Sequence, residues 1–110
     1  MRLGDKQRLF GELVTRLLVE LHLRGYRFSF GASYRAPEWG VGHAKSLHGL
    51  KLAVDLNLFK RDEDLGWVFC RDTDDHRELG EWWEKQHPLC RWGGRFNDGN
   101  HYSIEHNGMK

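Results

Sequence analysis

Cysteine and proline are both scarce in this sequence, with two residues of each among 110. Cys70 and Cys90 have no C-x-x-C pair between them, so they can build neither a four-thiolate zinc site nor a disulfide framework. Pro37 and Pro88 fall where periodic patterns break, and no repeat, low-complexity tract or Pro/Gly-rich linker divides the chain. We therefore expect one continuous domain, residues 1–110, with two reduced thiols.

The sequence also lacks an excess of one charge and a long apolar run. Its 17 basic and 16 acidic residues give a formal net charge of +1, and without a strong positive field we expect no nucleic-acid partner. Asp5 and Glu12 interrupt the apolar residues of the N-terminal segment, which therefore predicts neither a signal peptide nor a membrane span. We expect synthesis in the cytoplasm and no membrane association.

Aromatic residues, by contrast, are abundant, since five Trp, six Phe and three Tyr are present. Such large side chains favour a small core that buries much area per residue. Apolar residues that recur at every third or fourth position predict an amphipathic helix over 5–24. A second helix is predicted over about 74–86, with Leu79, Trp82 and Trp83 on its buried side.

Three further segments, 26–30, 52–59 and 100–106, alternate apolar and polar residues with the period of a β-strand. In the second segment Asp55 lies on the face opposite the leucines, and in the third His101 lies on the face opposite the apolar residues. Helices that flank a small, mostly antiparallel sheet make the predicted fold class α+β.

Two predicted strands thus each present an imidazole or a carboxylate from a polar face. His48 precedes Asp55 by seven residues, which allows the loop before the strand to fold a histidine back over the strand aspartate. His48, Asp55 and His101 together make a ligand set that suits a borderline cation such as Zn²⁺. A catalytic zinc usually has three protein ligands and keeps its fourth position for water.

At these residues the sequence resembles the zinc D-Ala-D-Ala carboxypeptidases and VanX-like peptidases, particularly the phage endolysins that act as L-alanyl-D-glutamate peptidases. The first signature of this family reads S-x-H-x-x-G-x-A-x-D, and the chain matches it in register at Ser46, His48, Ala53 and Asp55. The second signature is an acidic residue three positions before a histidine, which Asp98 and His101 match. Two separated motifs in the right order are more specific than either alone.

The resemblance implies that His48, Asp55 and His101 are zinc ligands and that Asp98 is the catalytic general base. Arg35 matches an arginine of the family that lies near the substrate, so it is expected in the catalytic site as a substrate clamp. Ser46, in the first signature, is expected to contact the substrate as well.

Several of these residues have a second interpretation. Asp98 lies in Asn-Asp-Gly-Asn and can serve only to shape that turn, while Arg35 can equally pair with a carboxylate. Trp92 either contacts the substrate at the floor of the cleft or is a core tryptophan. Glu105 either orients His101 or is simply solvated. The remaining histidines expected at the surface are His22, His76, His87 and His106.

The chain departs from the first signature at Lys51, where the family has glycine. If the backbone needs a positive φ at this position, lysine strains the turn. The departure touches none of the expected metal ligands.

By this resemblance we expect a zinc peptidase that cleaves an amide bond in the stem peptide of bacterial peptidoglycan. The first candidate bond is L-Ala–D-Glu and the second is D-Ala–D-Ala. The protein is expected to be a monomer that is made in the host cytoplasm and acts on the cell wall after release.

Two other classes of protein remain as alternatives. An inactive wall-binding module that keeps zinc for stability would usually fill the fourth ligand position. A metal-dependent nuclease would need a basic groove, against which the balanced charge argues.

Overall fold

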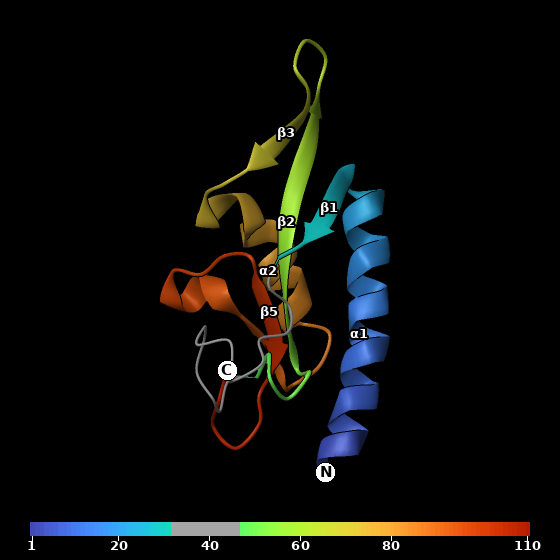
Figure 1. The fold of residues 1–110 in the computed structure, drawn as a ribbon, viewed down its shortest axis with the longest axis vertical. Helices are drawn as coiled ribbons and strands as arrows, with labels where there is room; N and C mark the ends of the chain where they lie inside the picture. Colours follow the sequence, from blue (N-terminus) through green and yellow to red (C-terminus); the bar gives the residue numbers. More distant parts are fainter. Residues whose placement is uncertain (32–46) are drawn as a thin grey trace.

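The computed structural model describes residues 1–31 and 47–110. In these residues helices and a mostly antiparallel sheet form one compact domain, which confirms the predicted α+β class (Figure 1). The elements in chain order are α1 (Leu3–Leu23), β1 (Tyr26–Phe30), β2 (Ala53–Asp62), β3 (Gly66–Cys70), η2 (Thr73–His76), α2 (Arg77–Glu84), β4 (Cys90–Trp92), η3 (Gly93–Phe96) and β5 (His101–Ile104). None of the described helices is both long enough and apolar enough to cross a membrane.

β2 is the central strand, and the sheet order is β1-β2-β5-β4 with β3 also paired to β2. One edge of β2 pairs with β1 over residues 56–60. The other edge pairs first with β5 at residues 53–55 and then with β3 at residues 58–62, so β5 and β3 follow one another along β2 (Figure 1). Between them Asn57 pairs with neither of these strands, and the N–H of Leu56 donates to Asn100 O at 2.9 Å.

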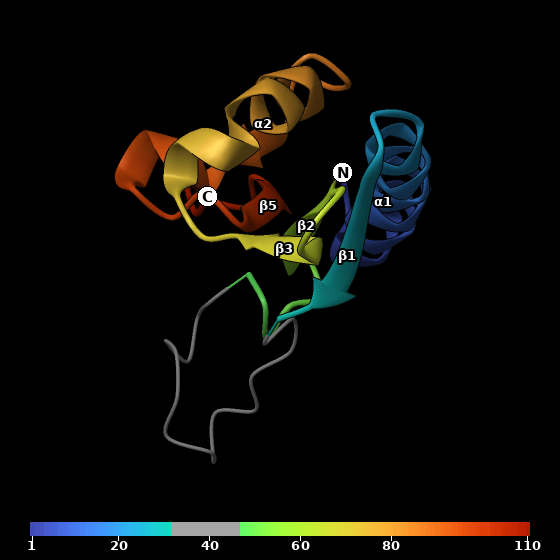
Figure 2. The same cartoon turned by 90° about the horizontal axis from the view of Figure 1, so that it is seen from above.

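Both helices pack on the same face of this sheet (Figure 2). Phe10 of α1 and Trp83 of α2 meet edge to face, with ring centroids 6.1 Å apart. The indole N–H of Trp83 donates to the carbonyl oxygen of Ser103 at 3.1 Å, which ties α2 to β5. The side chains buried most completely here are Leu13, Leu17, Leu21, Leu52, Leu56, Leu58, Leu79, Trp83, Cys90, Trp92, Tyr102 and Ile104.

The opposite face of the sheet carries the polar residues. Because side chains alternate along a strand, Asp55, Asn57 and Phe59 of β2 point away from the helices. The pairing of Asp55 with His101 across β2 and β5 puts His101 on this face too. The strand alternation predicted from the sequence is thus confirmed, and it gathers the polar candidates on one side.

The histidine at the start of α2 corrects one expectation. His76 was expected at the surface, but it is buried and its Nδ1 lies 2.9 Å from the hydroxyl oxygen of Tyr102. The predicted helix begins as the 3-10 turn η2. His76 lies three and seven residues before Leu79 and Trp83, which are buried in α2, so it lies on the same core-facing side.

Burial of His76 predicts a pH dependence of stability. Burial lowers the pKa of His76 from 6.5 to about 4, with a small opposing contribution from the charge of Asp75. Between these values the unfolded chain binds the proton and the folded chain does not, so stability falls as the pH drops from 6.5 to 4. We expect a loss on the order of 3 kcal/mol in urea unfolding. The His76→Gln protein should lack this part of the loss, whereas the exposed control His22→Gln should keep it; equal slopes in all three proteins would contradict the assignment.

Candidate metal centre

The metal-ligand candidates come from two strands and one turn. Asp55 and His101 are directly paired residues of β2 and β5. His48 belongs to the turn before β2, which is closed by hydrogen bonds from Lys51 N to His48 O at 3.1 Å and from Leu52 N to Leu47 O at 2.8 Å. This turn folds His48 back over Asp55, as the spacing in the sequence suggests.

Three donor atoms converge at this point. The distances are 3.3 Å from His48 Nε2 to Asp55 Oδ1, 3.4 Å from His101 Nδ1 to Asp55 Oδ1, and 3.2 Å from His48 Nε2 to His101 Nδ1. A tetrahedral ion with bonds of about 2.0 to 2.1 Å holds its donors roughly 3.3 to 3.4 Å apart. The spacing of the donors therefore fits a zinc-sized ion, and we call these three residues the triad.

The triad is enclosed, since His48, Asp55 and His101 are only 4%, 5% and 7% exposed. Burial by itself would raise the pKa of Asp55, but hydrogen bonds and charge interactions with His101 and His48 outweigh it and hold the pKa below its ordinary value. Asp55 is therefore a carboxylate at neutral pH, which is the form that binds metal.

The far nitrogen of His101 is also engaged. His101 Nε2 lies 3.0 Å from the carbonyl oxygen of Lys110, and the Ser103 hydroxyl donates to the same oxygen at 3.0 Å. A ring that donates from Nε2 keeps Nδ1 deprotonated and free to bind a metal. Glu105, one candidate for this orienting role, instead forms an ion pair with Arg91 at 3.3 Å. The partner of His101 is a main-chain oxygen, which leaves no signal in side-chain patterns.

A cavity of about 200 Å³ opens where β3 and β5 separate along β2, and it is lined by Asn57 and Asn100 but by none of the triad residues. Asn57, His76 and Asp98 are among its lining residues. The main chain of Asp98 is fixed, because its N–H donates to Gly93 O at 2.8 Å and its carbonyl accepts from His101 N at 3.1 Å. Asp98 is thus an exposed residue on a fixed turn that lines this cavity, three positions before the triad residue His101.

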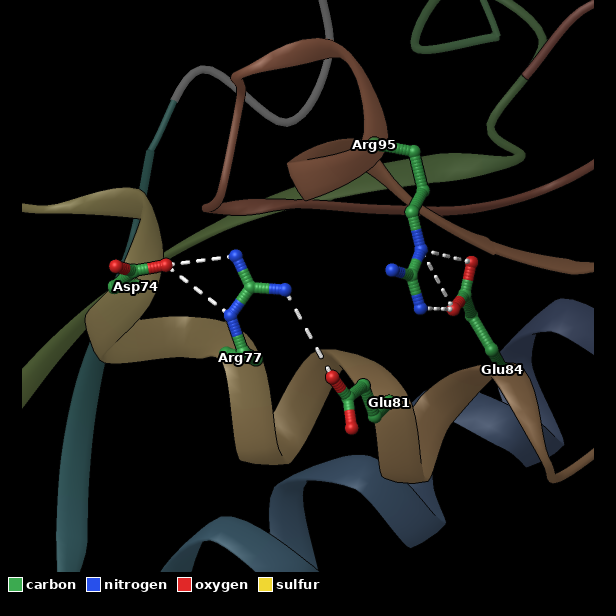
Figure 3. A network of polar contacts seen from close by, with 5 residues as sticks. All are labelled: Asp74, Arg77, Glu81, Glu84 and Arg95. Atoms are coloured by element: carbon green, nitrogen blue, oxygen red, sulfur yellow. Dashed lines mark hydrogen bonds and ion pairs between the residues drawn. The ribbon is translucent and has the colours of Figure 1, made fainter.

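One ion pair joins the segment before Asp98 to α2, and two others involve Arg77 at the start of α2 (Figure 3). Arg95 of η3 binds Glu84 at 2.7 Å, and on the same helix Arg77 binds Asp74 at 2.7 Å and approaches Glu81 at 3.8 Å. The guanidinium groups of Arg77 and Arg95 also lie over the indole of Trp92, at 5.5 and 5.4 Å from its centroid, respectively. Each exposed pair stabilises the fold only slightly, and only the pair of Arg95 with Glu84 joins η3, which precedes the Asp98 turn, to α2.

The structure places the remaining predicted site residues as follows. Trp92 is buried among core side chains, and its indole N–H donates to Gly99 O at 2.7 Å. This agrees with the core interpretation of Trp92 rather than with a cleft floor. Arg35 and Ser46 lie outside the described residues.

Lys51 has the backbone conformation that the family glycine suggests, with φ of 60°. A left-handed conformation costs an L-residue roughly 1 to 2 kcal/mol, so lysine strains this turn. We expect Lys51→Gly to raise the free energy of unfolding by about 1 kcal/mol, after the larger unfolded-state entropy of glycine is subtracted. Lys51→Ala keeps the Cβ atom and should bring no gain. Urea denaturation of both variants tests this, and an equal gain in both would contradict strain as the cause.

No protein-family model matches the chain, and no curated protein matches it significantly in sequence. The case for a metal centre therefore stands on the geometry of the triad itself.

Proposed function

We propose that this protein is a zinc peptidase that hydrolyses an amide bond in the stem peptide of bacterial peptidoglycan, most readily the L-Ala–D-Glu bond. The observation that carries the proposal is the buried triad, whose donor atoms lie 3.2 to 3.4 Å apart. The likeness of the two sequence signatures to the peptidoglycan peptidases supports the substrate class.

Each residue has a role in this reaction. An ion held by the triad would act as a Lewis acid that polarises the scissile carbonyl and lowers the pKa of water. Asp98 accepts the proton of the attacking water and returns it to the leaving amine. Arg35 binds a carboxylate of the stem peptide or the developing oxyanion, and Ser46 contacts the substrate. We further propose that the protein acts as a monomer on the cell wall after its release from the host cytoplasm.

Digestion of purified cell wall tests this function. Mass spectrometry of the released fragments should show new free amino termini on D-Glu, and chelation of the metal should abolish their release. New amino termini on D-Ala would move the cleavage to D-Ala–D-Ala. New reducing sugar ends, or intact wall after prolonged incubation with the zinc-loaded protein, would reject a stem-peptide peptidase.

A further inference from the structure

The sheet face that carries Asp55 continues beyond the metal centre as a row of aromatic and basic side chains. Phe59 of β2 is paired with Phe69 of β3, and Arg61 of β2 with Trp67 of β3. Arg27 of β1 is paired with Phe59 on the other edge. These five residues, here called the aromatic face, all lie on the side of the sheet away from the helices.

The side chains of the aromatic face form one connected surface. The rings of Phe59 and Phe69 have centroids 5.7 Å apart. The guanidinium groups of Arg27 and Arg61 lie 5.2 and 5.8 Å from the centroid of the Trp67 ring. The surface thus alternates flat apolar rings with planar hydrogen-bond donors.

This surface is open to solvent, since Trp67 is 46% and Phe69 51% exposed. The same chain buries Trp83 and Trp92 completely in its core, so the fold can accommodate large rings. The exposure of Trp67 and Phe69 therefore needs another explanation. Contiguous exposed apolar groups of this kind mark a binding surface.

The aromatic face is continuous with the metal centre. A strand rises ~3.3 Å per residue, so Phe59 begins only roughly 13 Å along β2 from Asp55. Asn57, between them on the same face, and Phe69 both line the cavity that also contains Asp98. A chain bound at the triad and running along β2 would therefore pass directly onto the aromatic face.

We propose that the aromatic face binds the glycan strand of the polymer whose stem peptide is cleaved, an inference that rests on the proposed function. The alanine of an L-Ala–D-Glu bond is attached to the lactyl group of a sugar, so the glycan lies one residue from the cleaved bond. Sugar rings present C–H faces that pack on aromatic rings, while their hydroxyl and acetamido groups accept hydrogen bonds from arginine. Asp62 at the end of β2, and Glu63 and Asp64 in the adjoining turn, would repel the phosphates of a nucleic acid.

Binding of peptide-free glycan strands in the presence of a chelator tests this proposal by calorimetry. The wild-type protein should bind, and the double variant Trp67→Ala, Phe69→Ala should bind at least about tenfold more weakly, because truncated aromatic anchors dominate such losses. Both side chains are exposed, so the variant should fold, which its melting temperature verifies. Val68→Ala is the matched control, since Val68 is 38% exposed and points to the opposite face of the same strand; it should bind as the wild type does.

Three results would overturn the proposal. The first is that the wild-type protein does not bind the glycan, and the second is that the folded double variant binds it equally well. The third is that the double variant keeps glycan binding but loses binding to a single-stranded oligonucleotide or loses dimerisation. Wall cleavage is measured on the same wild-type preparation after it is loaded with zinc and without chelator. Cleavage without glycan binding rejects the aromatic face alone, whereas glycan binding without cleavage rejects the proposed function alone.

Discussion

Replacing His101 with Ala should abolish metal binding and wall cleavage together. His101 supplies one of three donor atoms that lie within 3.4 Å of each other, and two remaining ligands cannot hold an ion against water. Partners that only orient a metal ligand are already worth about 10- to 100-fold in affinity or activity, so loss of the ligand itself should cost more than about 100-fold. Elemental analysis and a wall-lytic assay on the same sample measure both effects.

A matched control is His22→Ala, which removes an exposed histidine of α1 far along the chain from the triad. It should keep about one ion per chain and the parental rate. His48→Ala should behave like His101→Ala. Both triad variants should also lose the stabilisation that added metal gives the wild-type protein, because metal-binding free energy is partly folding free energy. Full zinc occupancy in His101→Ala would reject this ligand set.

The second large effect is expected at Asp98, which is proposed to transfer protons without holding the metal. Asp98→Asn should lower the rate of wall cleavage about 10²- to 10⁴-fold, the usual contribution of general acid–base catalysis. Metal content and melting temperature should stay close to those of the parent. The hydrogen bonds of this residue to Gly93 O and from His101 N are made by its main chain, so they survive the substitution.

The competing interpretation of Asp98 is a turn former. It predicts the reverse pattern, a lower melting temperature with near-normal turnover in the protein that remains folded. Asp64→Asn is a suitable control, because it removes an exposed carboxylate from the turn between β2 and β3 and should change neither rate nor metal content. A folded, metal-loaded Asp98→Asn protein that cleaves wall at the parental rate would exclude Asp98 as the base.

The sequence predicts the parts of the fold whose side chains repeat regularly. The leucines of α1 and the alternation around Asp55 and His101 leave clear periods, and both correspond to observed elements. β3 was not predicted, because Trp67, Val68 and Phe69 are consecutive exposed apolar residues without alternation. β4 has three residues, which is too short for a period to show.

The residues of the candidate site also differ in how far the sequence predicts them. The triad could be predicted, since a motif fixes residue types and spacing near one strand pair. The burial of His76 was missed, although its spacing of three and seven residues before Leu79 and Trp83 indicates the buried side of α2. Its partner, the hydroxyl of Tyr102 in β5, could not be predicted from local sequence. The contact of His101 with the main-chain oxygen of Lys110 could not be predicted from the sequence either, because every residue has such an oxygen. The sequence shows that Lys51 stands where the first signature has glycine, but only the structure shows that the backbone has a positive φ there.

The most direct test of the metal centre is an anomalous difference map at the zinc edge, from crystals grown with excess zinc. One peak should be bonded to His48 Nε2, Asp55 Oδ1 and His101 Nδ1 at roughly 2.0 to 2.2 Å. A triad without a peak under these conditions, whether or not zinc is found elsewhere on the chain, would contradict the account.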